Sequence, residues 1–306
     1  MTKTIKLTCM GDFAVSDFFS LDTVRHNGRF SYLDEADSSC PGALVYCQNL
    51  PYLCLAKENP NVSAIITTPT LAAEPIHNSK SVIIADDPRF AFFTLYVDFH
   101  ATGRNQPKME FGIGKDCRIH PSAVVSSKTR IGDRVEIGPG VVIEDFVQIM
   151  DDVFIGSNAV IGAEGLITLR RANGSLLMIK HAGGVLVGKS VVILAGAVVA
   201  KSLFLTPTTI GDNCQIGIMA NVGHGVSICE QSVISSNTVI SGRTKLGPRV
   251  WMGASSSIAQ GLTVGEGAQI KMGAVVVSDI SPNAVVSGNF AVSHKANMRH
   301  FLKLGK

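Results

Sequence analysis

The chain has 306 residues, of which 46% are hydrophobic and 17% charged, a balance that supports two modest folded domains and excludes a disordered protein. Its net charge is +3, and no basic face interleaved with aromatic residues precedes the last dozen residues, so nucleic acid is not expected as a partner. Aromatic residues make up only 6% of the chain while glycine occurs 30 times, which favours closely spaced aliphatic layers.

The N-terminal segment lacks the features of a targeting signal. Met1 to Phe19 contains Asp12 and Asp17 and has no uninterrupted apolar core, so we expect no secretory signal peptide. The longest apolar stretch, Val191 to Ala200, is too short to cross a bilayer, which takes roughly 20 residues. We therefore expect a cytoplasmic protein without membrane insertion.

The cysteines are odd in number, form no CxxC pair and sit among apolar neighbours. This pattern is typical of reduced structural thiols and predicts neither a disulfide framework nor a zinc site. We expect no bound metal or cofactor. The residues are Cys9, Cys40, Cys47, Cys54, Cys117, Cys214 and Cys229.

Residues 1 to 110 form the first predicted domain, of the α/β class. Short aliphatic segments, Ser63 to Thr67 and Ser81 to Ala85, predict strands. Asp87 and Pro88 have the residue types of an N-cap and a first helical position, and the apolar run Phe90 to Phe99 that follows would pack on a sheet.

Residues 111 to 288 are dominated by a six-residue repeat. Aliphatic residues recur at every sixth position from 113 to 167 and from 187 to 199, and after a shift of one residue from 210 to 276, which gives 25 repeat positions. A helix is excluded, because six residues at about 100° each would scatter these side chains over three faces. Short strands joined by turns can instead bury one large aliphatic residue on each side of a prism.

Three repeats make one coil of eighteen residues, so the repeat predicts about eight coils. Glycine follows the aliphatic residue in 12 of the 25 repeats and would supply either unusual backbone angles or close approach at each corner. The pattern resembles the left-handed parallel β-helix of hexapeptide-repeat acyltransferases. The resemblance implies a homotrimer with active sites between neighbouring chains.

Residues 168 to 184 interrupt the repeat and predict an extruded loop. Arg170, Arg171, Lys180 and His181 make this segment basic. Loops on a rigid scaffold often carry function, so we favour a role in binding over a merely solvated loop.

Residues 289 to 306 predict a C-terminal helix with a basic surface. Such a helix most often caps the end of a solenoid, and it could also meet an anionic acyl donor.

His224 is the best candidate for a catalytic base. Histidine suits proton transfer near neutral pH, and His224 lies between Gly223 and Gly225 at a predicted prism corner. The segment from Ile210 to Gly247 resembles the catalytic stretch of UDP-3-O-acylglucosamine N-acyltransferases, and this resemblance places His224 on their catalytic histidine. The loop ending in Lys180 and His181 is also similar, which implies a contact with substrate.

The same resemblance extends to the N-terminal domain. Tyr46, Asn49 and Tyr52 have the spacing with which that family binds uracil through two aromatic residues and an asparagine. An aromatic face can stack on a pyrimidine, while an amide can both donate to and accept from its edge. We therefore expect a nucleotide-sugar site here rather than a plain surface turn.

Several further residues are weaker candidates. Asn221 could orient His224 or contact the sugar, or satisfy only backbone. Gly242 and Gln260 follow His224 by one and two coils, and Gln260 could contact the pantetheine arm or join a polar ladder. Gly253 and Lys271 are assigned to donor binding, although prism geometry alone explains such a glycine.

The sequence departs from the acyl-carrier-protein-dependent family at two points. The second family histidine falls near Gln260, where this chain has none, and the exit of the repeat is similar to that of sugar acetyltransferases that use coenzyme A. We expect N-acylation of a dTDP- or UDP-linked amino-deoxy sugar by acyl-CoA, for O-antigen or other surface glycan synthesis. The alternatives are the carrier-protein-dependent N-acyltransferase of lipid A synthesis and a non-catalytic assembly subunit.

Overall fold

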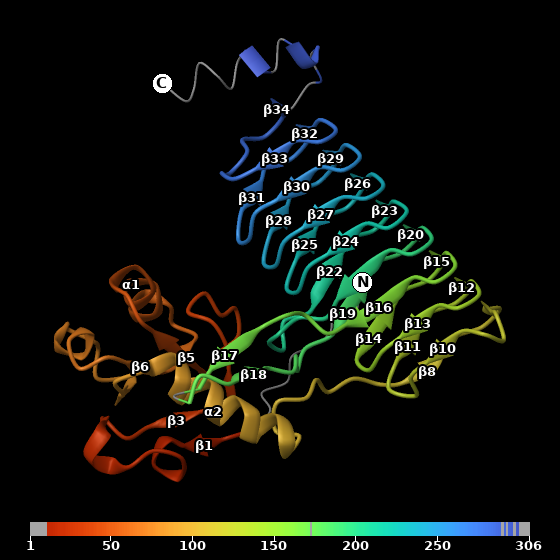
Figure 1. The fold of residues 1–306 in the computed structure, drawn as a ribbon. Helices are drawn as coiled ribbons and strands as arrows, with labels where there is room; N and C mark the ends of the chain where they lie inside the picture. Colours follow the sequence, from red (N-terminus) through yellow and green to blue (C-terminus); the bar gives the residue numbers. More distant parts are fainter. Residues whose placement is uncertain (1–10, 172, 289–290, 292, 296–297, 300–306) are drawn as a thin grey trace.

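The computed structural model describes residues 11–171, 173–288, 291, 293–295 and 298–299 (Figure 1). An N-terminal domain lies beside the first coils of a long prism of stacked strands, and a hairpin from the prism reaches across to it (Figure 1). The predicted helix of residues 289 to 306 falls largely outside the described residues. None of the helices in the described ranges combines the length and apolar character needed to cross a bilayer.

The N-terminal domain is built on a five-stranded sheet with the strand order β2, β7, β6, β5, β4. Neighbouring strands from β4 to β7 run parallel, and β2 is antiparallel to β7. The elements are β1 (Phe13–Ala14), η1 (Val15–Asp17), η2 (Leu21–Thr23), β2 (Val24–Arg25), β3 (Arg29–Phe30), β4 (Tyr32–Leu33), β5 (Ala43–Cys47), α1 (Leu50–Glu58), β6 (Val62–Thr67), η3 (Leu71–Ala73), β7 (Ser81–Ile84) and α2 (Pro88–Ala101).

Helix α2 begins where the sequence predicts it. The Asp87 side chain accepts a hydrogen bond from the backbone N–H of Phe90 at 2.9 Å, which satisfies one of the free donors of the first turn. Phe92 and Phe99 are fully buried on α2 and pack in one cluster with Leu44 and Ile66 of the sheet. The predicted α/β class of this region is confirmed.

Residues from Gly112 to Val286 form a left-handed parallel β-helix with three sheets, as predicted. The first sheet contains β8 (Gly112–Ile113), β11 (Arg130–Ile131), β14 (Val147–Ile149), β19 (Val185–Val187), β22 (Thr208–Ile210), β25 (Ser227–Ile228), β28 (Lys245–Leu246) and β31 (Thr263–Val264). The second contains β9 (Arg118–Ile119), β12 (Glu136–Ile137), β15 (Phe154–Ile155), β20 (Val192–Ile193), β23 (Gln215–Ile216), β26 (Val233–Ile234), β29 (Trp251–Met252), β32 (Gln269–Ile270) and β34 (Val285–Val286). The third contains β10 (Val124–Val125), β13 (Val142–Ile143), β16 (Val160–Ala163), β21 (Val198–Ala200), β24 (Asn221–Val222), β27 (Val239–Ile240), β30 (Ser257–Ile258) and β33 (Val275–Val276).

The core of the prism consists of the repeated aliphatic residues stacked in columns. Ile155, Ile193 and Ile216 pair in register on successive second-sheet strands, and all three are fully buried. Burying one such side chain contributes roughly 1.5–3 kcal/mol, so the stacked columns are the main source of stability of the β-helix.

Close approach between coils and the left-handed backbone angle, the two roles expected of glycine at the corners, occur at different positions of the repeat. A Cβ on Gly132 would lie 2.7 Å from the carbonyl carbon of Met150 in the next coil, so the glycine after the aliphatic residue allows close approach between coils. The left-handed angle falls two residues later, as at Arg134 (φ 56°) and Asn213 (φ 58°). Most of these left-handed corner residues are not glycine, and the strain of each one is part of the repeat.

Two long connections leave the same edge of the prism. Residues 164 to 184 join β16 to β19 and form an antiparallel hairpin of β17 (Thr168–Arg170) and β18 (Leu176–Met178), where the sequence predicted a loop. Ile167 was predicted as a repeat position, but it packs on the core of the N-terminal domain. The apparent shift of one residue before Ile210 is in fact the longer connection of residues 201 to 207, between β21 and β22.

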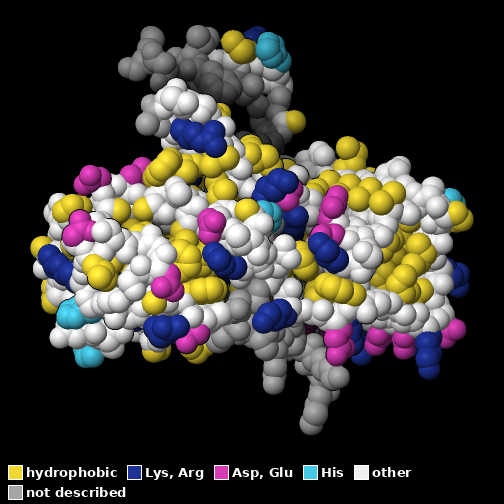
Figure 2. All heavy atoms as spheres, turned by 90° about the horizontal axis from the view of Figure 1, so that it is seen from below, with side chains coloured by type: hydrophobic (Ala, Val, Ile, Leu, Met, Phe, Trp, Pro, Cys, Tyr) yellow, Lys and Arg dark blue, Asp and Glu magenta, His cyan; other side chains and the backbone are white. Residues whose placement is uncertain are grey.

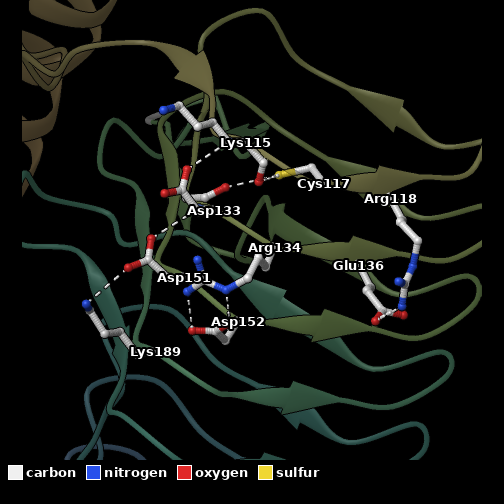
Figure 3. A network of polar contacts seen from close by, with 10 residues as sticks. Lys115, Cys117, Arg118, Asp133, Arg134, Glu136, Asp151, Asp152 and Lys189 are labelled. Atoms are coloured by element: carbon white, nitrogen blue, oxygen red, sulfur yellow. Dashed lines mark hydrogen bonds and ion pairs between the residues drawn. The ribbon is translucent and has the colours of Figure 1, made fainter.

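The early coils carry a ladder of polar contacts at the corner between the first and second sheets (Figure 3). The two long connections leave a different corner, between the third and first sheets. Asp133 accepts a hydrogen bond from the backbone N–H of Lys115 at 2.8 Å, and Asp151 accepts one from Asp133 at 3.1 Å. Asp151 also pairs with Lys189 at 3.1 Å, and Arg134 with Asp152 at 2.6 Å. These contacts tie each coil to the next one and lie on a different corner from His224.

Charged side chains of both signs are interspersed over the face of the molecule seen in Figure 2. This distribution agrees with the small net charge of +3. It gives that face no single electrostatic sign.

Candidate functional site

His224 lies in the turn between β24 and β25, which joins the third sheet to the first. Gly223 permits close approach here, because a Cβ at this position would lie 2.7 Å from the backbone nitrogen of Gly242. Gly225 follows with a left-handed φ of 66°, and its N–H donates to the buried Thr208 hydroxyl at 2.8 Å. We refer to the connections between the third and first sheets as the His224 corner.

The His224 ring is confined by two glycines and a second histidine. A Cβ on Gly242 would lie 2.6 Å from Nε2 of His224, and one on Gly165 would lie 3.2 Å from its Cδ2. The His181 ring stands at 66° to the His224 ring, with 5.3 Å between the ring centroids. Connections from three different coils therefore meet around one imidazole.

The surroundings of His224 favour its neutral form. Burial, with a smaller contribution from charge repulsion by the nearby His181 and Arg243 side chains, lowers its pKa to about 4. At neutral pH the ring is therefore unprotonated and able to accept a proton. This is the state that a general base requires.

His181 does not lie on the surface, although it was predicted to bind substrate. Its side chain is 0% exposed, whereas the neighbouring Lys180 is exposed. Nδ1 of His181 lies 3.3 Å from Oε2 of Glu164, and the backbone N–H of His181 donates to the same oxygen at 2.9 Å. Oε1 of Glu164 lies 2.7 Å from Nζ of Lys201.

Helix α2 holds both long connections in place. The Tyr96 hydroxyl donates to the carbonyl of Leu203 at 2.6 Å and accepts from the N–H of Ala182 at 2.9 Å. Leu203 and Phe204 are buried in the same cluster as the phenylalanines of α2. The N-terminal domain thus fixes the position of the loops that surround His224.

The predicted nucleotide residues gather at one edge of the N-terminal sheet. Tyr46 lies near the end of β5, Asn49 is the N-cap of α1 and Tyr52 is in its first turn. This is the edge formed by the carboxyl ends of the parallel strands, where open α/β sheets bind ligands. The Tyr46 ring packs on Phe92 and Phe93, with centroids at 5.0 and 5.8 Å, whereas Tyr52 is 50% exposed.

Asn49 has a structural role in addition to the predicted one. Its side-chain oxygen accepts a hydrogen bond from the N–H of Tyr52 at 3.1 Å, which caps α1. The residue is exposed. The amide nitrogen is a donor that the cap does not use.

Charged residues that the sequence analysis did not select connect this edge to the His224 corner. Glu35 follows β4 and pairs with Arg243, which comes directly after Gly242, and Asp37 lies 3.7 Å from Lys245. The Tyr46 hydroxyl is close to Arg89 and within the electrostatic influence of Glu35 and Arg243, and burial raises its pKa. No local motif marks these residues, because their role comes from contacts across more than 200 residues of chain.

Comparisons with known proteins match the β-helix. Residues 112–145, 128–163 and 207–242 match the family described as bacterial transferase hexapeptide (six repeats), and residues 243–278 match the hexapeptide repeat of succinyl-transferase. The chain is a hexapeptide-repeat protein. These matches confirm the predicted resemblance, and all of these residues lie within the β-helix.

Sequence and structure searches found relatives of this hexapeptide-repeat chain. It is 29% identical over 119 residues to a UDP-3-O-acylglucosamine N-acyltransferase of Coxiella burnetii, a match that covers 39% of this chain and 29% of that protein. A UDP-N-acetylglucosamine acyltransferase from Campylobacter jejuni aligns with a TM-score of 0.45 at 25% identity, over 56% of this chain and 72% of that one. A perosamine N-acetyltransferase from Caulobacter crescentus aligns with a TM-score of 0.20 at 18% identity, over 74% and 66%.

The predicted donor residues of this hexapeptide-repeat protein fall at two different corners. Gly242 and Gln260 stack above His224 on the His224 corner, where the Gly242 carbonyl accepts from the N–H of Gly261 at 3.0 Å. Gly253 and Lys271 follow second-sheet strands and lie on the next corner of the prism. A Cβ on Gly253 would lie 2.5 Å from the backbone nitrogen of Met272, so prism geometry explains this glycine. Asn221 is exposed on the outer face of β24.

We predict that Gly242→Ala displaces the His224 ring while the β-helix stays folded. The new methyl group would overlap the imidazole, which is a side chain that can move, and not the backbone. Crystal structures would show the ring shifted, and thermal melts would change by only a few degrees.

Gly223→Ala is the matched control on the same corner. Its Cβ would lie 2.7 Å from both the backbone nitrogen of Gly242 and the carbonyl oxygen of Ile240, so the coil itself must move. This variant should lose much more stability. Equal losses in the two variants would contradict a specific contact between Gly242 and the ring.

Proposed function

We propose that this hexapeptide-repeat protein is an N-acyltransferase that moves an acyl group from acyl-CoA to the amine of a dTDP- or UDP-linked amino-deoxy sugar. The observation that carries the proposal is the neutral, confined imidazole of His224 at a corner joined to the carboxyl edge of the N-terminal sheet. A base and a ligand-binding edge are the two parts that such a transfer needs. The product would serve surface glycan or O-antigen synthesis in the cytoplasm.

In the proposed reaction the sugar amine attacks the thioester carbonyl and forms a tetrahedral intermediate. His224 accepts the proton released from the amine nitrogen, and collapse of the intermediate breaks the carbon–sulfur bond and expels the CoA thiolate. The proton held on His224 then returns to the thiolate or to solvent. The low pKa of His224 keeps it ready to accept the proton at neutral pH.

The nucleotide would occupy the edge that carries Tyr46, Asn49 and Tyr52. Tyr52 offers an exposed ring for stacking on the pyrimidine, and Asn49 has an amide donor to spare. Arg89, at the start of α2, adds a guanidinium beside Tyr46, which suits the negative charge of a nucleotide diphosphate.

The donor would lie between neighbouring chains. Gly242 and Gln260 flank His224 on the same corner of one chain. Gly253 and Lys271 lie on a different corner, so in the proposed homotrimer they would contact the donor at the His224 corner of an adjacent copy. Exposed apolar side chains on the second and third sheets, among them Val239, Trp251 and Val275, would be covered by this assembly.

Light scattering should give three times the 32.4 kDa chain mass, and a monomer at micromolar concentration would contradict a shared site.

The similarity to the Coxiella burnetii protein supports a second candidate, the carrier-protein-dependent N-acyltransferase of lipid A synthesis. The chain spans 29% of the length of that relative. The two candidates differ in the donor, so activity with hydroxyacyl carrier protein but not with acyl-CoA would favour the second. A non-catalytic subunit would show activity with neither donor.

We predict that His224→Ala folds normally and loses most of its turnover, by about 10²–10⁴-fold, which is the usual contribution of a general base. The test is thiol release from acetyl-CoA and short hydroxyacyl-CoAs with a panel of dTDP- and UDP-amino sugars. Because the pKa of His224 is depressed, the rate of the native protein should stay high as pH falls through 6.5 and decline only at lower pH. Full activity of His224→Ala would assign the proton to another group.

We predict that Asn49→Asp separates the two roles of this side chain. The aspartate oxygen can still cap α1, but it cannot donate to a pyrimidine, so stability should hold while affinity for the nucleotide sugar falls about ten-fold. Calorimetry measures the affinity and thermal melts measure the cap. Asn49→Ala is the control that loses both, and unchanged affinity in Asn49→Asp would leave Asn49 as a cap only.

A further inference from the structure

Glu164, His181 and Lys201 form an ionic cluster behind the His224 ring, in which His181 is buried while Glu164 and Lys201 are partly exposed. Burial alone would raise the pKa of Glu164, but hydrogen bonds from His181 and Lys201 outweigh it and lower the pKa to about 2, so the carboxylate is charged. One oxygen faces the ring and backbone of His181, and the other faces Lys201. The three residues come from the two long connections that interrupt the repeat.

His181 carries a cost that packing alone does not explain. Both ring nitrogens, Nδ1 and Nε2, are buried and have no hydrogen-bond partner among the described residues. A buried polar atom without a partner costs roughly 1–3 kcal/mol, which a phenylalanine at this position would avoid. A Cβ on Gly165 would lie 2.5 Å from this Nε2 and 3.2 Å from Cδ2 of His224, so Gly165 lets the two rings approach each other.

We infer that Glu164 and His181 are a positioning pair, which fixes the plane of the His224 ring. The inference rests on the proposed role of His224 as the base. It assigns His181 to the support of the base instead of to contact with substrate, since its side chain is fully buried.

The pair can do this because each member is itself held. The backbone N–H of His181 donates to Glu164, whose Oε2 also lies 3.3 Å from Nδ1 of the ring, and the N–H of the next residue, Ala182, donates to the Tyr96 hydroxyl. Within the described part of the chain no hydrogen bond orients the His224 ring itself, so the edge of the His181 ring and the surface of Gly242 set its plane.

The charged groups around His224 lower its pKa. A carboxylate next to a histidine usually raises the histidine pKa, but here Lys201 neutralises Glu164, and His181 stands between Glu164 and His224. On the other side Arg243 faces His224 and is itself paired with Glu35. Removing His181 takes away one of the groups that lower the pKa of His224.

His181→Phe is the deciding variant. It keeps an aromatic ring but removes the unpartnered nitrogens, so the melting temperature should stay the same or rise, while kcat falls about ten-fold with little change in KM for the nucleotide sugar. A residue with only a structural role would lose stability and keep its kcat. His120→Phe, at an exposed histidine of the β-helix, is the matched control and should change neither.

A second readout needs no substrate. Carbethoxylation of His224 by diethyl pyrocarbonate, followed by peptide mass spectrometry across pH, reports the fraction of neutral imidazole. The midpoint should lie below 6.5 in the native chain and rise by about half a unit or more in His181→Phe. Failure of every amino-sugar substrate would overturn the proposed function. The pH midpoint of His224 modification would still show whether His181 acts on His224.

Glu164→Gln tests the pair if His181→Phe does not fold. It should lower kcat, and the double variant should be no worse than either single one, because the two residues act as a unit. Additive losses, or an unchanged His224 midpoint in His181→Phe, would overturn the inference.

Discussion

The whole site depends on how closely successive coils approach at the His224 corner. Glycine at positions 165, 223 and 242 leaves room for one imidazole between three turns, and a methyl group at any of them would meet a ring or the backbone of the next coil. The aliphatic columns hold these turns in register, because Val222 and Ile240 pair in the strands that precede two of them. The position of His224 is therefore set by the core of the prism.

The same corner is also where the repeat is broken. Two long connections leave it in successive coils, and their apolar residues Leu169, Leu203 and Phe204 are part of the N-terminal core. The insertions thus make one folded unit of two parts that have different architectures. They also bring Glu164 and Lys201 close to the catalytic candidate, at a position that an uninterrupted repeat would leave to solvent.

The repeat and the helix caps were predictable because they are local. A six-residue period identifies the prism, Asp87 and Pro88 identify the start of α2, and the glycines around His224 mark a corner. The contacts that lower the pKa of His224 are long-range and leave no such signal. Ile167 continued the period by coincidence although its side chain belongs to another core, and the interval of eleven residues between Val199 and Ile210 was the one visible sign of the second insertion.

The arrangement also explains why a base of low pKa would sit beside an ionic cluster. In the proposed reaction the sugar amine would lose its proton to His224 only while the ring is neutral, so positive neighbours that would hinder many histidines would be useful here. Arg243 supplies one such charge and is held by Glu35, which follows a strand of the N-terminal sheet. Burial raises the pKa of Glu35 and the Arg243 guanidinium opposes that rise, so the pair is favoured only while the two domains stay in contact. A ligand that ordered the edge of this sheet would strengthen that contact, and the proposed binding edge and His224 would then be coupled through the ion pairs between the two domains.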